Sequence, residues 1–443
     1  KVNYTDVYSQ VRCWDTLIYN HLKSKHIVIP PREDQEKATQ YEGAYVKDPD
    51  LGLHKWIVSF DLNSLYPHLI MQYNISPETY YDVKTNGISV ENMLSQQVNL
   101  KFTKDKNITI APNGAMFRRD KQGFLPELMQ KMYGDRVVYK KKMIEAKKEF
   151  EKTKDPIYKN EIARCHNIQM AKKIALNSAY GAIGNQYFRY FDVKQAEAIT
   201  LGGQLSIRWI ERDVNKFMNK VLETDNQNYV VASDTDSIYI SMGKLVEKVC
   251  KDKTPQQITD FLDKVSEQKL QKIIDGSFEH LADYVNAFEQ KMVMKREAIA
   301  NKGIWVAKKR YMLNLFDEEG IRYEYPKLKV MGVEAVKSST PEICRTKIKE
   351  AIRVIMNESE DDLIKYVADF KELFKTLSPE EVAFPRSCNN IMKFADSSSI
   401  YKKGTPIHVK GALIYNYNLH KHKLEMKYPV IRDGDKIKFL MLK

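Results

Sequence analysis

Short apolar runs and longer segments with a helical period divide the chain into predicted strands and helices. The run from Trp56 to Phe60 is apolar and rich in β-forming residues, which predicts a buried strand leading directly into Asp61. Residues 228–232 and 237–241 also predict strands, and because only Ser233 to Asp236 separate them we expect a β-hairpin. Aspartates therefore lie at the ends of the predicted strands.

Two helices are predicted between the first strand and the hairpin. The first covers residues 126–152, with Pro126 in the first turn, where proline is tolerated, and Asp155-Pro156 beyond its end. The second is expected from about Lys159 to Ala179, stopping before Gly181. Together they form an α-hairpin that is crowded with Lys and Arg.

The chain is too long for one compact core. With 443 residues, two to four subdomains are expected, and the hydrophobic fraction of 43% is ordinary for a globular protein. From about Pro341 the pattern is helical through Ala368, and after Phe384 it becomes irregular and then strand-like. The C-terminal quarter is therefore predicted to begin with helix.

Basic residues exceed acidic ones, 71 against 58, which gives a net charge of +13. Such a surplus favours a polyanionic partner, of which nucleic acid is the commonest, although a merely basic protein accounts for the charge equally well. The basic α-hairpin shares this ambiguity, because a basic helical face is usually solvated surface.

Features that the sequence lacks disfavour other classes of protein. The five cysteines form no C-x-x-C pair, so a zinc knuckle is not expected, and scattered thiols suit a reducing cytoplasm. No run of about 18 apolar residues is present, so we expect no membrane span. The chain opens with Lys1 rather than Met, which favours an excerpt or a processed form of a longer protein.

The aspartates at the strand ends have the arrangement that phosphoryl transfer requires. This chemistry needs neutralisation of phosphate charge more than a protein nucleophile, and two Mg²⁺ ions held by carboxylates on rigid backbone supply it. Asp234 and Asp236 are two residues apart, which in an extended chain places both side chains on one side. Asp-Thr-Asp alone is weak support for a site, because aspartate is common in turns.

Three segments resemble the polymerase motifs of the family B DNA polymerases, in the family's order. They are Ser59-Phe60-Asp61-Leu62-Asn63-Ser64-Leu65-Tyr66-Pro67, Lys173-Ile174-Ala175-Leu176-Asn177-Ser178-Ala179-Tyr180-Gly181 and Asp234-Thr235-Asp236-Ser237. Flanking segments resemble the replicative polymerases of T-even-type phages: Asn74-Ile75-Ser76-Pro77-Glu78-Thr79, Lys308-Lys309-Arg310-Tyr311 and Lys337-Ser338-Ser339-Thr340-Pro341. The resemblance covers nearly the whole chain.

The resemblance implies an α+β fold with the family's right-hand architecture. An antiparallel-sheet palm, fingers made of a helical hairpin and a mostly helical thumb are expected. The implied divisions are a connector from an N-terminal exonuclease region (1–32), palm (33–123), fingers (124–186), palm (187–332) and a partial thumb (333–443). No acidic constellation of a proofreading exonuclease precedes Asp61, so that activity is not expected of this chain.

The implied function is DNA-templated DNA synthesis, in which a primer 3′-hydroxyl attacks the α-phosphate of a deoxynucleoside triphosphate and releases pyrophosphate. By resemblance, Asp61 and Asp236 are catalytic and bridge two Mg²⁺ ions, which Mn²⁺ can replace. Asp234 would be a weaker or outer catalytic ligand. The backbone carbonyl of Leu62 would complete the shell of one ion.

The residues implied to bind the nucleotide lie in the first motif and on the two helices: Ser64, Leu65, Tyr66, Arg136, Lys140, Lys173, Asn177 and Tyr180. Lys173, Asn177 and Tyr180 have the spacing i, i+4, i+7 and share one helical face. Arg136 and Lys140 are likewise one turn apart. By resemblance, the ring of Tyr66 fills the space that a ribose 2′-hydroxyl would need.

The residues implied to contact DNA are Gly181, Glu297, Lys308, Lys309, Arg310 and Tyr311. A surface salt bridge would explain Glu297 equally well, and a surface charge run would explain the basic cluster. The expected partners are primer–template DNA and dNTP, with a sliding clamp and an exonuclease region in the full-length or assembled protein. A monomer is expected, in the cytoplasm of a phage-infected bacterium.

Two departures from the family pattern stand beside two alternative functions. Ala232-Ser233 precede Asp234 where the family has tyrosine and glycine, and His68 stands where it has serine.

A catalytically inactive DNA-binding relic of the fold is one alternative, but the carboxylates and cations of the motifs are all present. An RNA-synthesising polymerase is the other, and Tyr66 argues against it.

Overall fold

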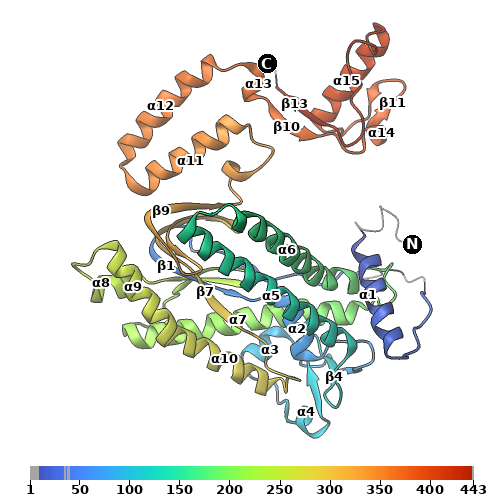
Figure 1. Cartoon of the computed structure of the whole chain (residues 1–443), viewed down its shortest axis with the longest axis vertical. Helices are drawn as coiled ribbons and strands as arrows, with labels where there is room; N and C mark the ends of the chain where they lie inside the picture. Colours follow the sequence, from blue (N-terminus) through green and yellow to red (C-terminus); the bar gives the residue numbers. More distant parts are fainter. Residues whose placement is uncertain (1–8, 34–35, 37–39, 442–443) are drawn as a thin grey trace. The chain divides into compact units, whose positions relative to one another are not determined.

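The computed structural model describes residues 9–33, 36 and 40–441, without the side chains of Lys148, Glu151 and Lys152. Contacts divide the chain into two compact units (Figure 1). The first consists of Lys1–Asp50, His54–Asn301 and Phe316–Glu324, and the second of Leu51–Leu53, Lys302–Leu315 and Tyr325–Lys443. The expected palm segment 187–332 is thus shared between the two units.

Helices and strands alternate irregularly along the chain, as expected of an α+β protein. The elements up to residue 241 are α1 (Gln10–Ser24), β1 (Gly52–Leu62), α2 (Leu65–Tyr73), β2 (Tyr80–Val83), α3 (Val90–Leu94), α4 (Lys101–Asp105), β3 (Ile108–Ile110), β4 (Ala115–Arg118), α5 (Phe124–Thr153), α6 (Ile157–Ile183), α7 (Val193–Leu222), β5 (Val230–Asp234) and β6 (Ser237–Ser241). There follow α8 (Gly243–Val249), α9 (Pro255–Val265), the π-helix η2 (Ser266–Leu270), α10 (Gln271–Tyr284), β7 (Met294–Ala307), β8 (Arg310–Glu318) and β9 (Ile321–Met331). The remaining elements are the 3₁₀-helix η3 (Glu334–Val336), α11 (Glu342–Asn357), α12 (Glu360–Thr376), α13 (Pro379–Val382), β10 (Phe384–Ser387), α14 (Ile391–Phe394), β11 (Ala395–Asp396), β12 (Ile400–Tyr401), α15 (Ile407–Lys421) and β13 (Lys436–Phe439).

A six-stranded sheet with the order β5-β6-β1-β7-β8-β9 contains all three predicted strands. β1 pairs antiparallel with β6 from Ile57 opposite Ser241 to Asp61 opposite Ser237. β5 and β6 form the predicted hairpin, and its loop consists of only Thr235 and Asp236. A second sheet has the order β2-β4-β3.

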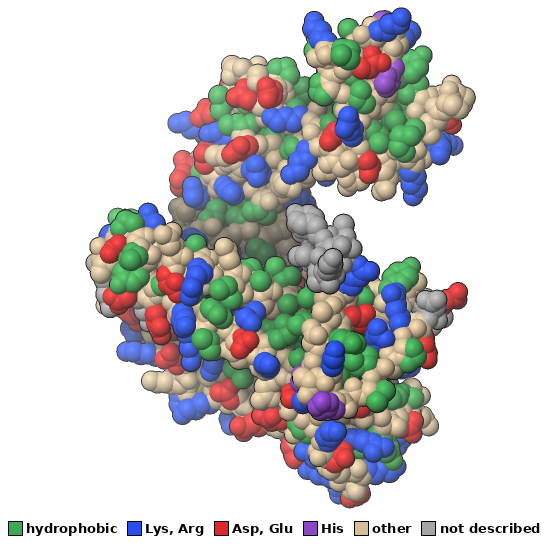
Figure 2. Space-filling model, turned by 45° about the vertical axis from the view of Figure 1, so that its right-hand side comes forward, with side chains coloured by type: hydrophobic (Ala, Val, Ile, Leu, Met, Phe, Trp, Pro, Cys, Tyr) green, Lys and Arg blue, Asp and Glu red, His purple; other side chains and the backbone are tan. Residues whose placement is uncertain are grey.

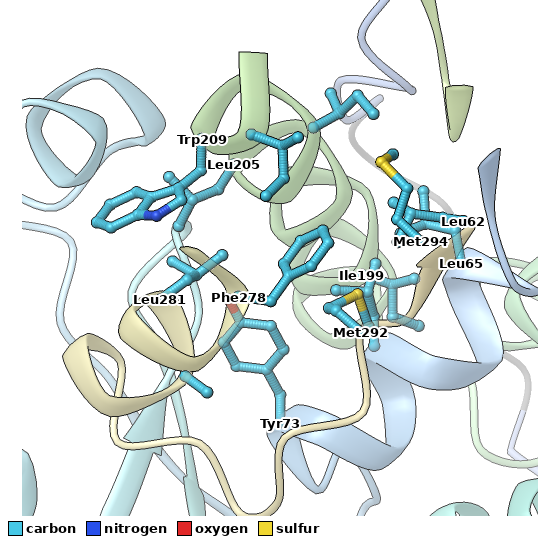
Figure 3. Close-up of a cluster of buried hydrophobic side chains, with 14 of the residues drawn as sticks. Leu62, Leu65, Tyr73, Ile199, Leu205, Trp209, Phe278, Leu281, Met292 and Met294 are labelled. Carbon is cyan, nitrogen blue, oxygen red and sulfur yellow. The ribbon is translucent and has the colours of Figure 1, made fainter. Parts of the chain in front are cut away.

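The main core of the first unit forms where α7 and α10 pack against each other and against α2 (Figure 3). Figure 3 shows Trp209 and Leu205 of α7 beside Leu281 and Phe278 of α10, with Tyr73 of α2 close to the ring of Phe278. All of these side chains are buried. Burial of large apolar side chains at helical spacing explains why these segments form helices.

Two adjacent glycines in α7 allow α2 to pack closely. A Cβ atom at Gly202 would lie 3.3 Å from Cε2 of Tyr73, and one at Gly203 would lie 3.3 Å from Cδ2 of Leu65. These distances are shorter than ordinary van der Waals contact, so larger residues would displace α2. Because the last three residues of the first motif form the start of α2, this packing helps to fix the position of that motif.

The predicted α-hairpin is present, and its second helix is longer than expected. α5 and α6 pack along each other, and Lys172 of α6 forms an ion pair with Asp135 of α5 at 3.0 Å. The expectation that the second helix stops before Gly181 is wrong, because α6 continues through Gly181 to Ile183. Ala182 and Ile183 are buried, and their packing outweighs the low helix propensity of glycine.

Within the expected connector, the structure has a helix. α1 has buried side chains at Trp14, Ile18 and Leu22, and it packs on α6. Trp14 Nε1 donates hydrogen bonds to the carbonyl oxygen of Ala175 (3.0 Å) and to Oγ of Ser178 (3.1 Å). The helical spacing of these apolar residues was the signal that the sequence reasoning missed. Residues 1–8, 34–35 and 37–39 lie outside the described residues.

The second unit contains more elements than its sequence pattern predicted. The helical pattern expected from about Pro341 through Ala368 is present as two helices, α11 and α12, and Ser359 caps the start of α12 in a capping box with Asp362. The region after Phe384, expected to be irregular and then strand-like, contains the 15-residue helix α15 before β13. α15 contributes Val409, Ala412 and Leu413 to a small separate core.

The surface is mixed in charge. Figure 2 shows Lys and Arg side chains spread over the visible face and interspersed with Asp and Glu, not gathered into one block. Among the helices that the structure describes, none is long and apolar enough to cross a membrane. The net positive charge therefore does not by itself mark the site.

The packing of α7 yields a first prediction. Ile199→Ala removes a fully buried side chain, and it should lower the free energy of unfolding by about 2–5 kcal/mol because a cavity remains. Ile157→Ala, at a position 67% exposed at the start of α6, is the matched control and should change it by less than about 0.5 kcal/mol. Urea unfolding followed by tryptophan fluorescence measures both, and equal shifts would contradict this account of the core.

Candidate active site

The carboxylates of the first and third motifs meet at the junction of β1 and the β5–β6 hairpin. Asp61 is next to last in β1 and lies opposite Ser237 of β6. The backbone N–H of Leu62 donates a hydrogen bond to the carbonyl oxygen of Asp236 at 2.8 Å. The sheet therefore brings Asp61 and Asp236 side by side from positions 175 residues apart in sequence.

The turn between β5 and β6 has a specific backbone shape. Thr235 has a φ of 60°, in the left-handed region, and its N–H donates to the carbonyl oxygen of Tyr45 at 3.0 Å. The N–H of Asp236 donates to the carbonyl oxygen of Asp234 at 2.6 Å. Asp234 and Asp236 therefore do not lie on one side of an extended chain, as expected, because the chain reverses between them. The turn itself brings them close.

Negative charge accumulates at this junction. The pKa of Asp236 is raised to about 6, first by burial and then by the neighbouring carboxylate of Asp234. Glu297 of β7 adds to the rise, whereas Lys173 of α6 opposes it. Glu297 also accepts a hydrogen bond from Oγ of Ser59 on β1 (3.3 Å). Four acidic or basic side chains from separate elements thus act on one another here.

The donor set fits a divalent cation. Asp61, Asp236 and the carbonyl oxygen of Leu62 offer oxygen ligands of the kind that Mg²⁺ prefers, from the end of β1 and from the tight turn between β5 and β6. Burial first, and then the carboxylate of Asp234, raise the pKa of Asp236, so its charged form would gain from a nearby cation. Among the described residues no group of three His, Cys, Asp or Glu side chains has metal-binding geometry.

The predicted face of α6 lies beside the first motif. Lys173 and Asn177 are exposed, and the ring of Tyr180 lies against the ring of Tyr66 with centroids 4.7 Å apart. Tyr41 meets Tyr180 edge-on at 6.4 Å. The pKa of Tyr66 is raised by burial and then by Asp236, which places the ring near the carboxylates. The second motif is thus joined to the first and third.

Two basic residues of α5 contact other elements of the site. Arg136 Nη1 donates a hydrogen bond to Oγ of Ser64 at 2.8 Å, and Ser64 has left-handed backbone (φ 50°, ψ 60°). Lys140, one turn later, lies 3.7 Å from Oε1 of Glu319. Leu65 is buried in the core (Figure 3), so its side chain does not face this space and only its backbone is available to a ligand.

Some predicted DNA-binding residues lie elsewhere in the chain. Lys308 and Lys309 form the turn between β7 and β8 in the second unit, where Tyr311 is buried and stacks on Trp305 at 5.7 Å. Arg310 forms an ion pair with Glu334. Gly181 lies within α6, and a Cβ atom there would meet nothing within 4 Å.

The structure adds two residues that sequence reasoning did not select. His68, which stands where the family has serine, is buried, and its Nδ1 lies 2.9 Å from the carbonyl oxygen of Ser64. Its ring meets Tyr133 of α5 edge-on at 4.5 Å, so it connects the first motif to the helix that carries Arg136. Glu319 occupies a β-turn, where no local pattern indicated that it would lie next to Lys140.

Comparison with known proteins is consistent with this geometry. The sequence profile of DNA polymerase family B matches residues 3–275, which is more than half of the chain and includes all three motifs. The chain belongs to DNA polymerase family B. This confirms the resemblance and the α+β fold that it implied.

Two proteins named DNA-directed DNA polymerase, from Escherichia phage RB69 and Enterobacteria phage T4, are 34% and 32% identical to this family B chain over its whole length. The chain spans 54% of each of them. A protein named DNA polymerase 1, from Pyrococcus abyssi, is 29% identical over 77% of the chain and 35% of its own length. These phage relatives confirm that the sequence is similar to the polymerases of T-even-type phages.

The raised pKa of Asp236 predicts how this family B chain responds to pH without metal. The folded-state pKa of about 6 is above the ordinary value of 3.8, so the folded chain holds the proton of Asp236 more tightly than the unfolded chain does. This contribution to the free energy of unfolding is fully present below about pH 4 and is lost as the pH rises through 6, by at most about 3 kcal/mol. Asp236→Asn should remove this loss, so the variant's stability advantage should grow over that range. Urea unfolding in EDTA measures it, with exposed Asp252→Asn as the control. A pH-independent difference would contradict the assignment.

Proposed function

We propose that the chain carries out DNA-templated addition of deoxynucleotides to a primer 3′-hydroxyl by two-metal phosphoryl transfer. The observation that carries the proposal is the pairing of Asp61 with Asp236 across β1 and the hairpin, fixed by the hydrogen bond from Leu62 N–H to Asp236 O. Family membership supports the same reaction.

Asp61 and Asp236 would hold the ions, with the carbonyl of Leu62 as a further ligand and Asp234 beside them. Two divalent ions, when bound, would neutralise charge on the triphosphate and on the primer 3′-oxygen. The protein's own contribution is to fix these oxygens on a sheet. The pKa of Asp236 is raised by burial and then by Asp234 and Glu297, so a bound cation would favour the ionised carboxylate.

The nucleotide would lie between the first motif and the fingers helices. Arg136, Lys140 and Lys173 would hold its phosphates, because a guanidinium forms two parallel hydrogen bonds and an ammonium acts as a point charge. Asn177 and the paired rings of Tyr66 and Tyr180 would meet its base and sugar. Backbone groups at Ser64 and Leu65 complete this side.

The duplex would be held by lysine and arginine against phosphates. Lys308, Lys309 and Arg310 form a basic turn in the second unit, and Tyr311 anchors it through its stack on Trp305. Gly332 lets the chain pass closely behind the turn, since a Cβ atom there would be 2.0 Å from the carbonyl oxygen of Lys309. Such contacts do not depend on sequence and weaken with salt.

Asp61→Asn and Asp236→Asn should each lower primer extension by roughly 10³-fold or more, on the scale of removing a charge-neutralising group in phosphoryl transfer. Binding of a labelled primer–template should change little. Asp252→Asn, an exposed position, is the control and should extend normally. Near-normal extension by either site variant would refute the metal assignment, and a wild-type chain that binds DNA without extending it would favour an inactive relic.

Tyr66→Ala should admit ribonucleotides more readily, because the ring excludes the 2′-hydroxyl by a clash and not by a missing attraction. The ratio of kcat/KM for a deoxynucleotide over a ribonucleotide should fall by at least about tenfold, the scale of one pocket group. Tyr66→Phe keeps the ring against Tyr180 and should keep the selectivity. An unchanged ratio in Tyr66→Ala would show that another residue discriminates.

A further inference from the structure

The turn between β8 and β9 places a carboxylate beside the two cations of α5. Glu319 lies at the tip of this turn, with its Oε1 3.7 Å from Nζ of Lys140. The same carboxylate acts on Arg136: burial lowers the pKa of that guanidinium, and Tyr133 and Glu319 raise it. One acidic side chain therefore faces both cations that the proposed function gives to the triphosphate.

The turn is held in place by its own hydrogen bonds. Glu319 and Gly320 both have left-handed backbone, with φ of 51° and 80°. The N–H of Glu319 donates to the carbonyl oxygen of Glu297 at 2.7 Å, and the N–H of Gly320 donates to Oδ1 of Asp317 at 3.1 Å. Asp317 is fully buried and binds Arg322 at 2.9 Å. The backbone of Glu319 is thus fixed next to the site.

The ion pair of Lys140 and Glu319 is too exposed to contribute much to folding. Its effect falls on ligands instead. A nucleoside triphosphate brings several negative charges to the same cations, so it must displace the carboxylate from Lys140 and is repelled by it. When pyrophosphate leaves, Glu319 restores the counter-charge of Lys140, which favours release.

We propose that Glu319 takes the place of the triphosphate beside Lys140 when no nucleotide is bound. Its carboxylate orients Lys140 and weakens the binding of nucleotide and of pyrophosphate. The identity of the ligand rests on the proposed function, whereas the competition rests on the position of Glu319 beside Lys140. Glu319 acts through Lys140 and is therefore a positioning residue.

The test compares Glu319→Gln with Glu318→Gln, at the last residue of β8, whose Oε2 accepts a hydrogen bond from the hydroxyl of Tyr323 at 3.1 Å. At low salt, Glu319→Gln should lower the KM for the nucleotide about three-fold in single-nucleotide extension, the scale of one exposed charge pair. Inhibition by inorganic pyrophosphate should strengthen similarly, and high salt should reduce both effects. Glu318→Gln should show neither.

The lowering of KM should depend mainly on Lys140, so Glu319→Gln should have a clearly smaller effect in a Lys140→Met background, where only its action on Arg136 and on the triphosphate remains. An unchanged or raised KM in Glu319→Gln overturns the proposal, and so does a lowering of KM that is equally large without Lys140.

A second probe needs no catalysis. The thermal shift caused by inorganic tripolyphosphate with Mg²⁺ should be larger in Glu319→Gln than in the wild type, because the ligand binds more tightly. Equal shifts refute this inference. A wild-type chain that does not extend a primer refutes the proposed function instead, so the two failures are distinguishable.

Discussion

Main-chain hydrogen bonds between β1 and the β5–β6 hairpin hold like charges together, and the rest of the site depends on them. Backbone pairing does not respond to the charge of side chains, so the sheet can keep Asp61 next to Asp236 although their carboxylates repel each other. Burial first, and then the neighbouring carboxylate of Asp234, raise the pKa of Asp236 at this junction. The proposed cation site thereby has a fixed backbone position.

The helices around this junction supply the opposite charge from separate elements. α6 brings Lys173 near Asp236, and α5 brings Arg136 onto Ser64. Both helices are positioned by apolar contacts at their bases, whereas their charged faces remain accessible. Packing and chemistry thus use different faces of the same helices, which allows a strongly charged site to exist in a stable core.

Local patterns in the sequence predicted the elements that carry the carboxylates, because a buried strand, a tight hairpin and a long basic helix each have a short-range signature. Family resemblance then selected Tyr66 and Lys173, which no periodicity distinguishes from core or surface residues. The end of α6 was misjudged at Gly181, since tertiary packing of Ala182 and Ile183 outweighed propensity. Glu319 could not be found at all, because its importance comes only from its position beside Lys140 in the folded chain.

The two hydrogen bonds from Trp14 to α6 hold one side of this helix, whereas the side chains of the second motif lie on another. At 100° per residue, Ala175 and Ser178 lie on the side of the helix opposite to Lys173, Asn177 and Tyr180. One of the two hydrogen bonds that Trp14 donates goes to the main-chain carbonyl of Ala175, which every amino acid possesses. Mutations can therefore alter Lys173, Asn177 and Tyr180 without removing this bond, so the face of α6 proposed to meet the nucleotide can vary while the packing of α1 on α6 stays the same.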